Sequence, residues 1–443
     1  MDERSAKVAR RDLLRSGIGL ASGSASLLAG LPLLGQAASD QALIDRAFQA
    51  QASQDYATAE TIFRRLLRAG RTDEFIMRGL AWNLSRQWKH AEAIAASLDN
   101  NRRNPCAWSV AQVCEAYVNA GDYENGAKWL RFAKQNETAW GDARPAFESA
   151  IEVVAAKTFV VEYTLDPAVL ANIAFLPKGD FLCPLPIPDL PYQTSSYEVE
   201  GALSTREETR AGNLCLRVTP DGGRRATVRC TVRLKPMSYR SRVRDFSLTD
   251  IPSSVAPLAR STRNVEIEHP TVKALAAELK ATSAITTIEN ICAWDHSNLK
   301  FDPRADGATL GGGSVAALKR KTGHCEGVTS GAVALLRACG VPARFVRGYG
   351  AVAGASGTPT MHTWTEFYVP GAGWIQWDGE NAPFAVPAKI CIGCFRYTSP
   401  YAAPGSGDAE TRDLWNFEAV LFPPGTAVGR SGNVRFRRVS MEL

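Results

Sequence analysis

The residues with the clearest chemical potential begin with Cys325. This cysteine opens an apolar stretch with helical spacing, closed by Gly340 and Pro342, two residues typical of a helix end. A thiol in the first turn of a helix ionises more readily, because the helix dipole and the unpaired backbone N–H groups attract negative charge. The same N–H groups could donate to an oxyanion formed during a reaction. Cys325 is therefore predicted to be a nucleophile.

A thiolate nucleophile needs a base, and a predicted hairpin provides one. Residues 361–369 alternate in character and are rich in aromatic side chains, which favours a strand with His362 at its start. A Pro-Gly-Ala-Gly turn follows, and residues 374–378 make the return strand. Residues at equal distances from such a turn face one another, so His362 is expected to face about residue 381, or residues 378–380 if the loop is bulged or asymmetric, which brings Asp378 within reach of the imidazole. A carboxylate there would fix the tautomer and favour the imidazolium.

This pattern resembles the transglutaminase-like superfamily, whose core shares the papain-type arrangement. The resemblance covers roughly His269–Asn381, and it includes the Gly-Val-Pro-Ala-Arg run at 340–344 and the Gly-Tyr pair at 348–349. Two upstream segments, 181–186 and 191–193, look like the β domain that precedes the core in this family. The resemblance implies a thiol enzyme whose helices pack on an antiparallel sheet.

Carried over to this sequence, the resemblance implies Cys325 as the nucleophile, His362 as the base and Asp378 as the residue that orients the base. Two positions depart from the family pattern. His324 stands where Asp or a small polar residue usually precedes the nucleophile, and Gly379-Glu380 stands where Pro-Thr usually follows the aspartate. The first departure could alter the electrostatics of the thiol, and the second leaves Asp378 and Glu380 as alternatives for the third position.

Such a triad predicts acyl transfer from an amide of a protein or peptide substrate. The Cys325 thiolate would attack the amide carbonyl, His362 would protonate the leaving amine, and a thioester would form. Resolution of the thioester by an amine gives transamidation, whereas resolution by water makes the chain a cysteine peptidase or amidase. A function of another class is also open: an inert triad would leave an envelope scaffold that binds partners through helical repeats.

The other candidate ligands and redox groups are interpreted as structural. Cys391 and Cys394 form a lone C-x-x-C, which is expected to be a local disulfide or two buried thiols rather than a zinc site. The sequence has no EF-hand pattern, so neither a calcium site nor another cofactor is expected. Four histidines without a spaced partner are expected to have no catalytic role: His90, His269, His296 and His324.

Length and composition indicate a globular chain. Its 443 residues suggest about three domains. Hydrophobic residues make up 45% and charged residues 22%, both near the average for globular proteins. The net charge of +6 is mild and the basic residues are scattered, whereas nucleic-acid binding usually concentrates Lys and Arg on one face. Nucleic acid is therefore not an expected partner.

Residues 1–39 are predicted to be an export signal. Arg10-Arg11 is followed by a spacer and two leucines, and then by a mildly apolar run rich in Gly and Ser over residues 16–34. Small residues at 37–39 would suit a signal peptidase. The segment resembles a twin-arginine signal, which implies a folded protein delivered to the periplasm or otherwise exported. Contact with the membrane is expected only through this signal.

Residues 40–155 have helical periodicity and an internal repeat. Tyr56, Trp88 and Tyr123 recur at separations of 32 and 35 residues, close to the period of tetratricopeptide repeats. One helix pair cannot bury its apolar face alone, so such pairs stack. Arrays of this kind usually bind a peptide or a partner protein, which is the partner that we expect for this segment.

The remaining periodicity completes a prediction of an α+β multidomain fold. Residues 156–260 alternate with period two, which predicts an antiparallel β domain like a small sandwich. Within it, the strands 214–218 and 226–234 are expected to form a hairpin through the Pro-Asp-Gly-Gly turn at 220–223. Residues 261–443 are predicted to be the papain-like, transglutaminase-like catalytic domain with a C-terminal extension.

Overall fold

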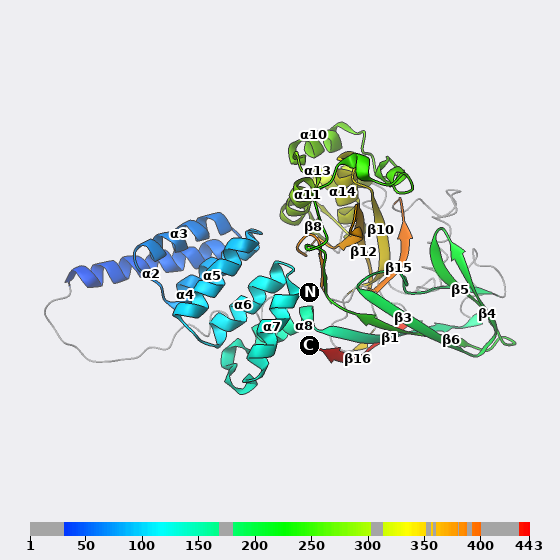
Figure 1. Cartoon of the computed structure of the whole chain (residues 1–443), viewed down its shortest axis with the longest axis horizontal. Helices are drawn as coiled ribbons and strands as arrows, with labels where there is room; N and C mark the ends of the chain where they lie inside the picture. The colour runs from blue at the N-terminus through cyan, green and yellow to red at the C-terminus, as the bar shows by residue number, and fades with distance from the viewer. Residues whose placement is uncertain are drawn as a thin grey trace.

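The computed structural model has three connected parts: a row of helices, a set of antiparallel sheets, and a four-stranded sheet covered by further helices (Figure 1). This is the α+β multidomain fold that the periodicity predicted. The structure describes residues 31–167, 180–302, 313–350, 356–357, 360–379, 381–387, 392–399 and 434–443.

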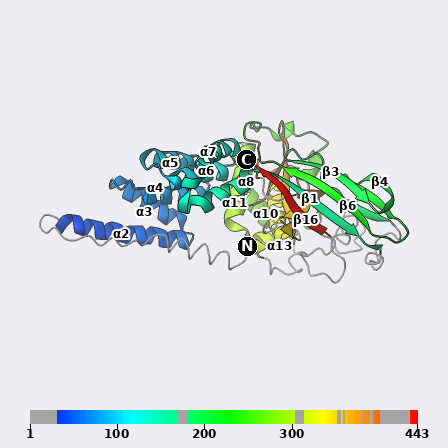
Figure 2. The ribbon, with the colours of Figure 1, turned by 90° about the horizontal axis from the view of Figure 1, so that it is seen from below.

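The row of helices, called the helical array below, runs from α2 to α8 and extends to one side of the molecule (Figures 1 and 2). Apolar residues at helical spacing face the neighbouring helices, as Ile62, Phe63 and Leu66 of α3 do. Asp55 and Asp122 cap the helices that follow them by accepting a backbone N–H bond. The helices are α2 (Leu31–Ala52), α3 (Tyr56–Arg68), α4 (Glu74–Arg86), α5 (His90–Arg103), α6 (Ala107–Asn119), α7 (Tyr123–Lys134) and α8 (Arg144–Val154), with the 3-10 turns η1 (Glu137–Ala139) and η2 (Gly141–Ala143) between α7 and α8.

The turns that precede α3, α5 and α7 are equivalent positions of the array. Gln54, Trp88 and Gly121 have positive φ angles of 64°, 59° and 73°, and they recur at intervals of 34 and 33 residues. Each stands two residues before the next helix, which in the second repeat begins at His90. The predicted repeat aligned Trp88 with Tyr56 and Tyr123; these tyrosines begin α3 and α7, whereas Trp88 lies in the turn before α5, so this alignment is out by two residues.

Helix α2 begins at Leu31 and passes through residues 37–39, where signal cleavage was predicted. The paired arginines of the predicted signal lie outside the described residues. In the part of the chain that the structure describes, no helix has the length and apolar character needed to cross a bilayer. The export signal therefore stays a prediction.

The β-rich part is built on one bent antiparallel ribbon. Its strands are β1 (Ala156–Leu165), β2 (Phe181–Pro184), β3 (Gln193–Glu200), β4 (Ala202–Arg210), β5 (Asn213–Pro220), β6 (Ala226–Leu234) and β7 (Met237–Ser238). β3 pairs with β6 and β4 pairs with β5, so the predicted hairpin of β5 with β6 is wrong: these two strands lie in different sheets. The ribbon closes instead at Ala211-Gly212, whose φ angles of 45° and 76° suit a two-residue turn with both residues left-handed.

The C-terminal strand β16 (Val434–Glu442) belongs to the same sheet as β1. β1 pairs with β6 along one edge and with β16 along the other, and the short β11 (Ser356–Gly357) pairs with β16. Phe159 of β1 and Phe436 of β16 lie with ring centres 4.7 Å apart. The far end of the described chain therefore completes the sheet that begins directly after α8.

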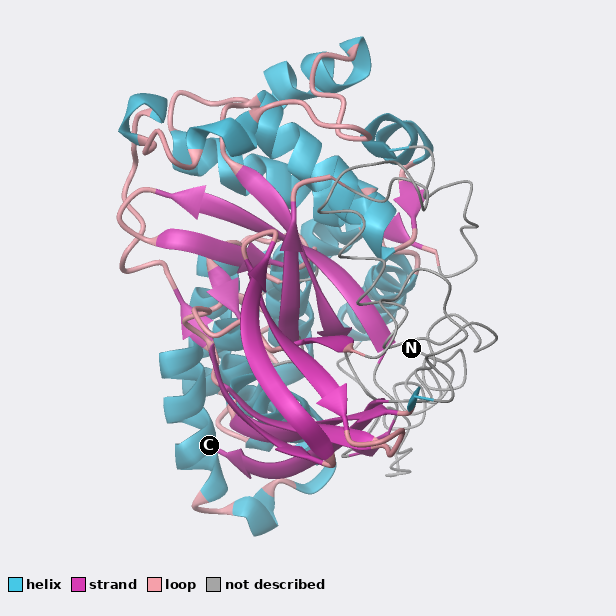
Figure 3. Cartoon of the chain, turned by 90° about the vertical axis from the view of Figure 1, so that its right-hand side faces the viewer, coloured by secondary structure: helices cyan, strands magenta, loops and turns pink. Residues whose placement is uncertain are grey.

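The third part, called the helix–sheet core below, has a four-stranded antiparallel sheet in the order β13-β12-β10-β15. α14 packs against β10 and β12, and α10, α11 and α13 pack against α14 (Figure 1). Figure 3 shows helices lying against the strands in the upper part of the molecule. The helical elements are η3 (Leu248–Asp250), η4 (Ala256–Ala259), α10 (Pro270–Leu279), α11 (Ala284–Asn298), α13 (Gly313–Arg320) and α14 (Cys325–Ala338). The strands are β8 (Lys300–Phe301), β9 (Thr322–Gly323), β10 (Ala343–Gly350), β12 (Thr360–Val369), β13 (Gly373–Trp377), β14 (Ala385–Val386) and β15 (Ile392–Tyr397).

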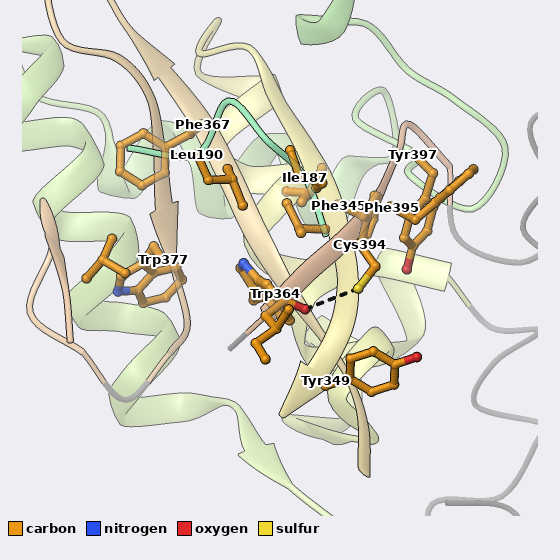
Figure 4. Close-up of a cluster of buried hydrophobic side chains, with 14 of the residues drawn as sticks. Ile187, Leu190, Phe345, Tyr349, Trp364, Phe367, Trp377, Cys394, Phe395 and Tyr397 are labelled. Carbon is orange, nitrogen blue, oxygen red and sulfur yellow. Dashed lines mark hydrogen bonds between the residues drawn. The ribbon is translucent and has the colours of Figure 1, made fainter. Parts of the chain in front are cut away.

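One apolar cluster joins the helix–sheet core to the β-rich part. Figure 4 shows Phe345 and Phe395 of the four-stranded sheet together with Ile187 and Leu190, which precede β3. The backbone follows the same contact, because Ile187 N donates to Gly393 O at 2.8 Å. Each fully buried large apolar side chain contributes about 1.5–3 kcal/mol. The sheet that carries the candidate base is therefore held from both sides.

Candidate active site

Cys325 is the first residue of α14, as the helical spacing predicted. His324 is the N-cap of this helix, and most of α14 is buried against β10 and β12. Cys325 is 5% exposed. Its sulfur therefore lies at the positive end of a helix dipole and near unpaired N–H groups, which favour a thiolate.

The candidate base and acid lie on adjacent strands. His362 is the third residue of β12, and its Nε2 lies 2.9 Å from a carboxylate oxygen of Asp378. Thr365 faces Trp377 in the pairing of β12 with β13, so Asp378, one residue beyond β13, reaches His362 diagonally. The two side chains are 26% and 32% exposed, which leaves a route from solvent. Glu380, the alternative third residue, lies outside the described residues.

A glycine on the neighbouring strand leaves room for His362. Gly348 of β10 lies opposite His362, and Gly350 is two residues further along the same strand. A Cβ added to Gly350 would lie 2.7 Å from the Cβ of His362, well inside van der Waals contact. Any side chain at this position would push the imidazole away.

Electrostatics favour the ionised forms of both the thiol and the imidazole. Burial alone would raise the pKa of the Cys325 thiol, but hydrogen bonds with His324 and His362 and the charge of Arg347 bring it down to about 5. Burial would likewise lower the pKa of the His362 imidazolium, but the Asp378 carboxylate and the contact with Cys325 raise it to about 10. Since Nε2 of His362 faces Asp378, Nδ1 is the nitrogen left for the sulfur. Between these two pKa values the pair is a thiolate and an imidazolium.

A second imidazole also contacts the sulfur. Nδ1 of His324 lies 3.1 Å from Sγ of Cys325, so this side chain turns to the sulfur instead of capping α14. The bond with Cys325 raises the pKa of His324. The His324 ring lies beside Phe301 of β8, with ring centres 5.5 Å apart. The sequence offered His324 no spaced partner, but its place beside Cys325, where the family pattern has another residue, was the signal that it could alter the electrostatics of the thiol.

Two residues at the end of α11 contact the segment that carries Asp378. Nδ1 of His296 lies 2.9 Å from the carbonyl oxygen of Gly379. Asp295 is 1% exposed, and burial together with the negative charge of Asp378 raises its pKa well above the usual range for a carboxyl. A Cβ added to Gly379 would lie 3.0 Å from Oδ2 of Asp295. Glycine therefore follows the aspartate at a place where a neighbouring helix leaves little space.

The residues that follow His362 on β12 hold the strand in place. Nε1 of Trp364 donates to Oε1 of Gln376 at 2.6 Å, which links β12 to β13. Glu366 is fully buried and pairs with Arg344 at 2.7 Å and with Arg396 at 3.1 Å. A buried carboxylate between two guanidinium groups is compensated in charge, so it fixes the position of β12.

The remaining candidates lie apart from this cluster. Cys394 is a buried free thiol, and Cys391 lies outside the described residues, so the expected local disulfide is not described. His269 caps α10 by accepting the Thr271 N–H at 3.1 Å. Among the residues that the structure describes, no group of three His, Cys, Asp or Glu side chains could hold a metal ion.

Comparison with known families matches the part of the chain that carries the candidate site. A profile of the transglutaminase-like superfamily matches residues 273–379, about a quarter of the chain, and this stretch contains Cys325, His362 and Asp378. The uncharacterized protein YebA of Bacillus subtilis (strain 168) is 33% identical over 82 residues, which are 16% of this chain and 11% of that protein. The chain therefore spans about a tenth of the length of this curated relative.

Three solved structures are similar to this chain at low sequence identity. A candidate cysteine protease from Cytophaga hutchinsonii is 15% identical with a TM-score of 0.38, and the match covers 64% of this chain and 98% of that one. The periplasmic domain of TgpA from Pseudomonas aeruginosa, bound to ethylmercury, is 17% identical with a TM-score of 0.28, over 54% of this chain and 95% of that one. A candidate protease from Parabacteroides distasonis is 13% identical with a TM-score of 0.23, over 56% and 62% of the two chains.

Proposed function

We propose that this chain, which carries a transglutaminase-like core over residues 273–379, breaks amide bonds through a thioester on Cys325. A core of this family is the framework of a thiol-dependent enzyme. The observation that carries the proposal is the arrangement around one sulfur: a buried thiol at a helix start, a low thiol pKa of about 5, and a His362 imidazole bonded to Asp378 at 2.9 Å. A buried cysteine with a purely structural role stays protonated, because burial raises the pKa of its thiol. The lowered pKa of Cys325 therefore favours a role as a nucleophile.

The first half-reaction follows from the two ionised groups. The Cys325 thiolate attacks the amide carbon, a C–S bond forms, and the carbonyl oxygen takes up the negative charge. Backbone N–H groups at the start of α14 would donate to that oxygen. The His362 imidazolium gives its Nδ1 proton to the amide nitrogen, the C–N bond breaks, and an amine leaves. Asp378 keeps Nε2–H in place, so the other nitrogen stays aimed at the reacting atoms.

The second half-reaction regenerates the thiolate. Neutral His362 takes a proton from the attacking water or amine, a C–O or C–N bond forms, and the C–S bond breaks to release the thiolate. Water gives hydrolysis, so the chain would be a cysteine peptidase or amidase. An amine gives transamidation, for which a glutamine side chain is the expected acyl donor. We propose a protein or peptide amide as the substrate, with the choice of acceptor decided by access to the thioester.

Trapping the thioester tests this proposal. The purified protein is incubated with peptide amides and glutamine-containing peptides, quenched in acid and measured by intact mass spectrometry, with hydroxylamine and water as competing acceptors. We expect an acyl adduct on Cys325 that hydroxylamine removes, and no adduct in Cys325→Ala. Cys339→Ala is the matched control, because Cys339 is a buried thiol at the other end of the same helix and should leave turnover unchanged.

The outcomes separate the enzyme from the scaffold. In a pulse of iodoacetamide at pH 6, Cys325 should label before the exposed Cys106, although Cys325 is buried. Hydroxamate formation without free acid would indicate transamidation, and free acid alone would indicate hydrolysis. Absence of both a labelling preference and an adduct with every peptide would reject the enzyme and favour a scaffold with an inert triad.

We also propose that the protein acts in the periplasm or otherwise outside the cytoplasm. The support is the sequence of residues 1–39, with its paired arginines and small residues near position 37. The segment can be fused to a reporter that reaches the periplasm only by the twin-arginine route. Replacing Arg10 and Arg11 by lysine should retain the reporter in the cytoplasm, and unchanged export would reject this signal.

A further inference from the structure

The helical array reaches the segment that carries Asp378, although the two are far apart in the sequence. Beyond Asp378 the chain turns, with Asn381 N donating to Asp378 O at 2.8 Å and Trp377 Nε1 donating to Asn381 O at 2.9 Å. Ala382 and Ala385 then join the apolar cluster formed by buried residues of α6, α7 and α8. Residues 378–379 and 381–386, called the acid segment below, therefore connect the candidate site to the array.

Two turns of the array make this connection, and they do so in opposite ways. Trp88 lies against the imidazole of His296, with ring centres 4.6 Å apart, and His296 in turn bonds the Gly379 carbonyl at 2.9 Å. Gly121 offers no side chain, and a Cβ added to it would lie 2.3 Å from the Cβ of Ala385. One turn thus supplies a large ring and the next leaves space for the acid segment.

The backbone at Trp88 makes its side chain informative. A bulky residue with a φ of 59° is uncommon, since only glycine adopts this region without steric cost. Gln54 occupies the equivalent turn of the first repeat with a φ of 64°, and its side chain is exposed. The indole of Trp88 stands at a position that favours glycine, and its ring contact with His296 at 4.6 Å links this turn to the acid segment.

We propose that the helical array is a positioning element of the active site: Trp88 and Gly121 hold the acid segment through His296 and Ala385, and thereby hold Asp378 against His362. His296 is a positioning residue, because it contacts the backbone beside Asp378 and not the reacting atoms. This inference rests on the proposed function for the assay of turnover. Alkylation of Cys325 provides a second readout that needs no substrate.

The first experiment compares Trp88→Gly with Gln54→Gly in the full chain. Both variants place glycine at a left-handed turn, so their effects on the backbone are matched. Trp88→Gly should lower kcat by at least about tenfold, since a misplacement of about 1 Å can cost about a hundredfold. It should also shift the pH at which iodoacetamide begins to label Cys325 upward, because a less stable imidazolium stabilises the thiolate less. Gln54→Gly should change neither quantity.

The second experiment uses the contact between Gly121 and Ala385. Gly121→Ala should lower kcat, because the new methyl group displaces Ala385. The double variant Gly121→Ala with Ala385→Gly should recover much of the loss, since the second change removes the atom that clashes. Gly70→Ala is the control: this glycine has a φ of 85° and no atom within 4 Å of an added Cβ, so kcat should stay unchanged.

Folding is measured on every variant by circular dichroism and thermal melting. If Trp88→Gly fails to fold, the comparison is made between His296→Phe and His296→Gln. Phenylalanine keeps a ring against Trp88 but cannot donate to the Gly379 carbonyl, whereas glutamine keeps a hydrogen-bond donor for that carbonyl. Here kcat should fall more for phenylalanine. A folded Trp88→Gly with the kcat and labelling profile of the parent would overturn the inference, as would failure of Ala385→Gly to rescue Gly121→Ala. If the parent turns over no substrate, the labelling profiles of Trp88→Gly and Gln54→Gly decide alone.

Discussion

Replacing Asp378 by asparagine separates the charge of this side chain from its shape. Asparagine offers a carbonyl oxygen that can still accept a bond from Nε2–H of His362, but it carries no negative charge. A hydrogen bond to a charged group contributes about 1.5–3 kcal/mol, against about 0.5–1.5 kcal/mol for a neutral one. The lost difference is about 1–1.5 kcal/mol, and one pKa unit corresponds to about 1.4 kcal/mol. Because Asp378 is 32% exposed, solvent screens part of its charge and the lower figure applies.

We therefore expect Asp378→Asn to lower the pKa of His362 from about 10 and to raise the pKa of Cys325 from about 5, each by about one unit or less. The signs follow from the pair. An imidazolium without a facing carboxylate loses its proton at a lower pH, and a thiolate facing a weaker cation takes up a proton at a higher pH. The pH range in which the ion pair exists should narrow from both ends.

The assay is the rate of iodoacetamide alkylation of Cys325 between pH 4 and pH 11, read by peptide mass spectrometry, beside the pH profile of kcat/KM. Asp378→Ala is the matched comparison, since it removes both charge and orientation. It should lose at least about tenfold more in kcat/KM than asparagine does, because positioned acid–base catalysis contributes about 10²- to 10⁴-fold. Identical labelling profiles for the parent, the asparagine and the alanine variants would refute the assignment of Asp378 as the partner of His362.

Three further predictions concern the surroundings of the triad. His324→Gln should raise the pKa of the Cys325 thiol above about 5, so the acidic limb of the alkylation profile should move to higher pH, while the alkaline limb, set by His362, stays in place. An acidic limb that does not move would show that the 3.1 Å contact of His324 with the sulfur contributes nothing. Gly350→Ala should lower kcat by at least about tenfold, because the added methyl group displaces His362. It should also lower the free energy of unfolding by about 1–3 kcal/mol through overpacking. Full activity would mean that the backbone of β10 shifts and His362 keeps its position. Asp295→Asn should raise the melting temperature at pH 8 but not near pH 4. The raised folded-state pKa means that the parent loses stability as pH rises above the unfolded value, and a neutral amide has no such loss; equal shifts at both pH values would contradict this.

The elements that carry the candidate site could be predicted from local signals. Helical spacing after Cys325 and the glycine at position 340 defined α14, and the Pro-Gly-Ala-Gly turn defined the hairpin of β12 with β13. Because that hairpin is local in sequence, its turn placed His362 near residues 378–381, and the family resemblance singled out Asp378 within that range. Local patterning is sufficient where the chain returns directly on itself.

Contacts between distant segments could not be predicted in the same way. The bond from His296 to the Gly379 carbonyl spans 83 residues, and periodicity says only that the end of α11 is helical. Two turn signals also competed in the β-rich part. The Pro-Asp-Gly-Gly stretch at the end of β5 is the stronger turn signal by composition, yet the ribbon closes at Ala211-Gly212. The reason is that β5 pairs with β2 and β4 in one sheet, whereas β6 pairs with β1 and β3 in another. The choice between such turns depends on tertiary pairing.

The pairing of β1 with β16 limits how this protein can be cut for biochemistry. A fragment that starts at residue 261, where the sequence suggests a self-contained unit, would retain β16 without the strand that covers it. Val434 and Phe436, now 1% and 3% exposed, would then face water, and the bare backbone edge would be free to recruit a second molecule. A fragment for recombinant work should therefore begin no later than Ala156 to keep β1 on β16, and it must also include the helical array to keep the contacts of Trp88 and Gly121.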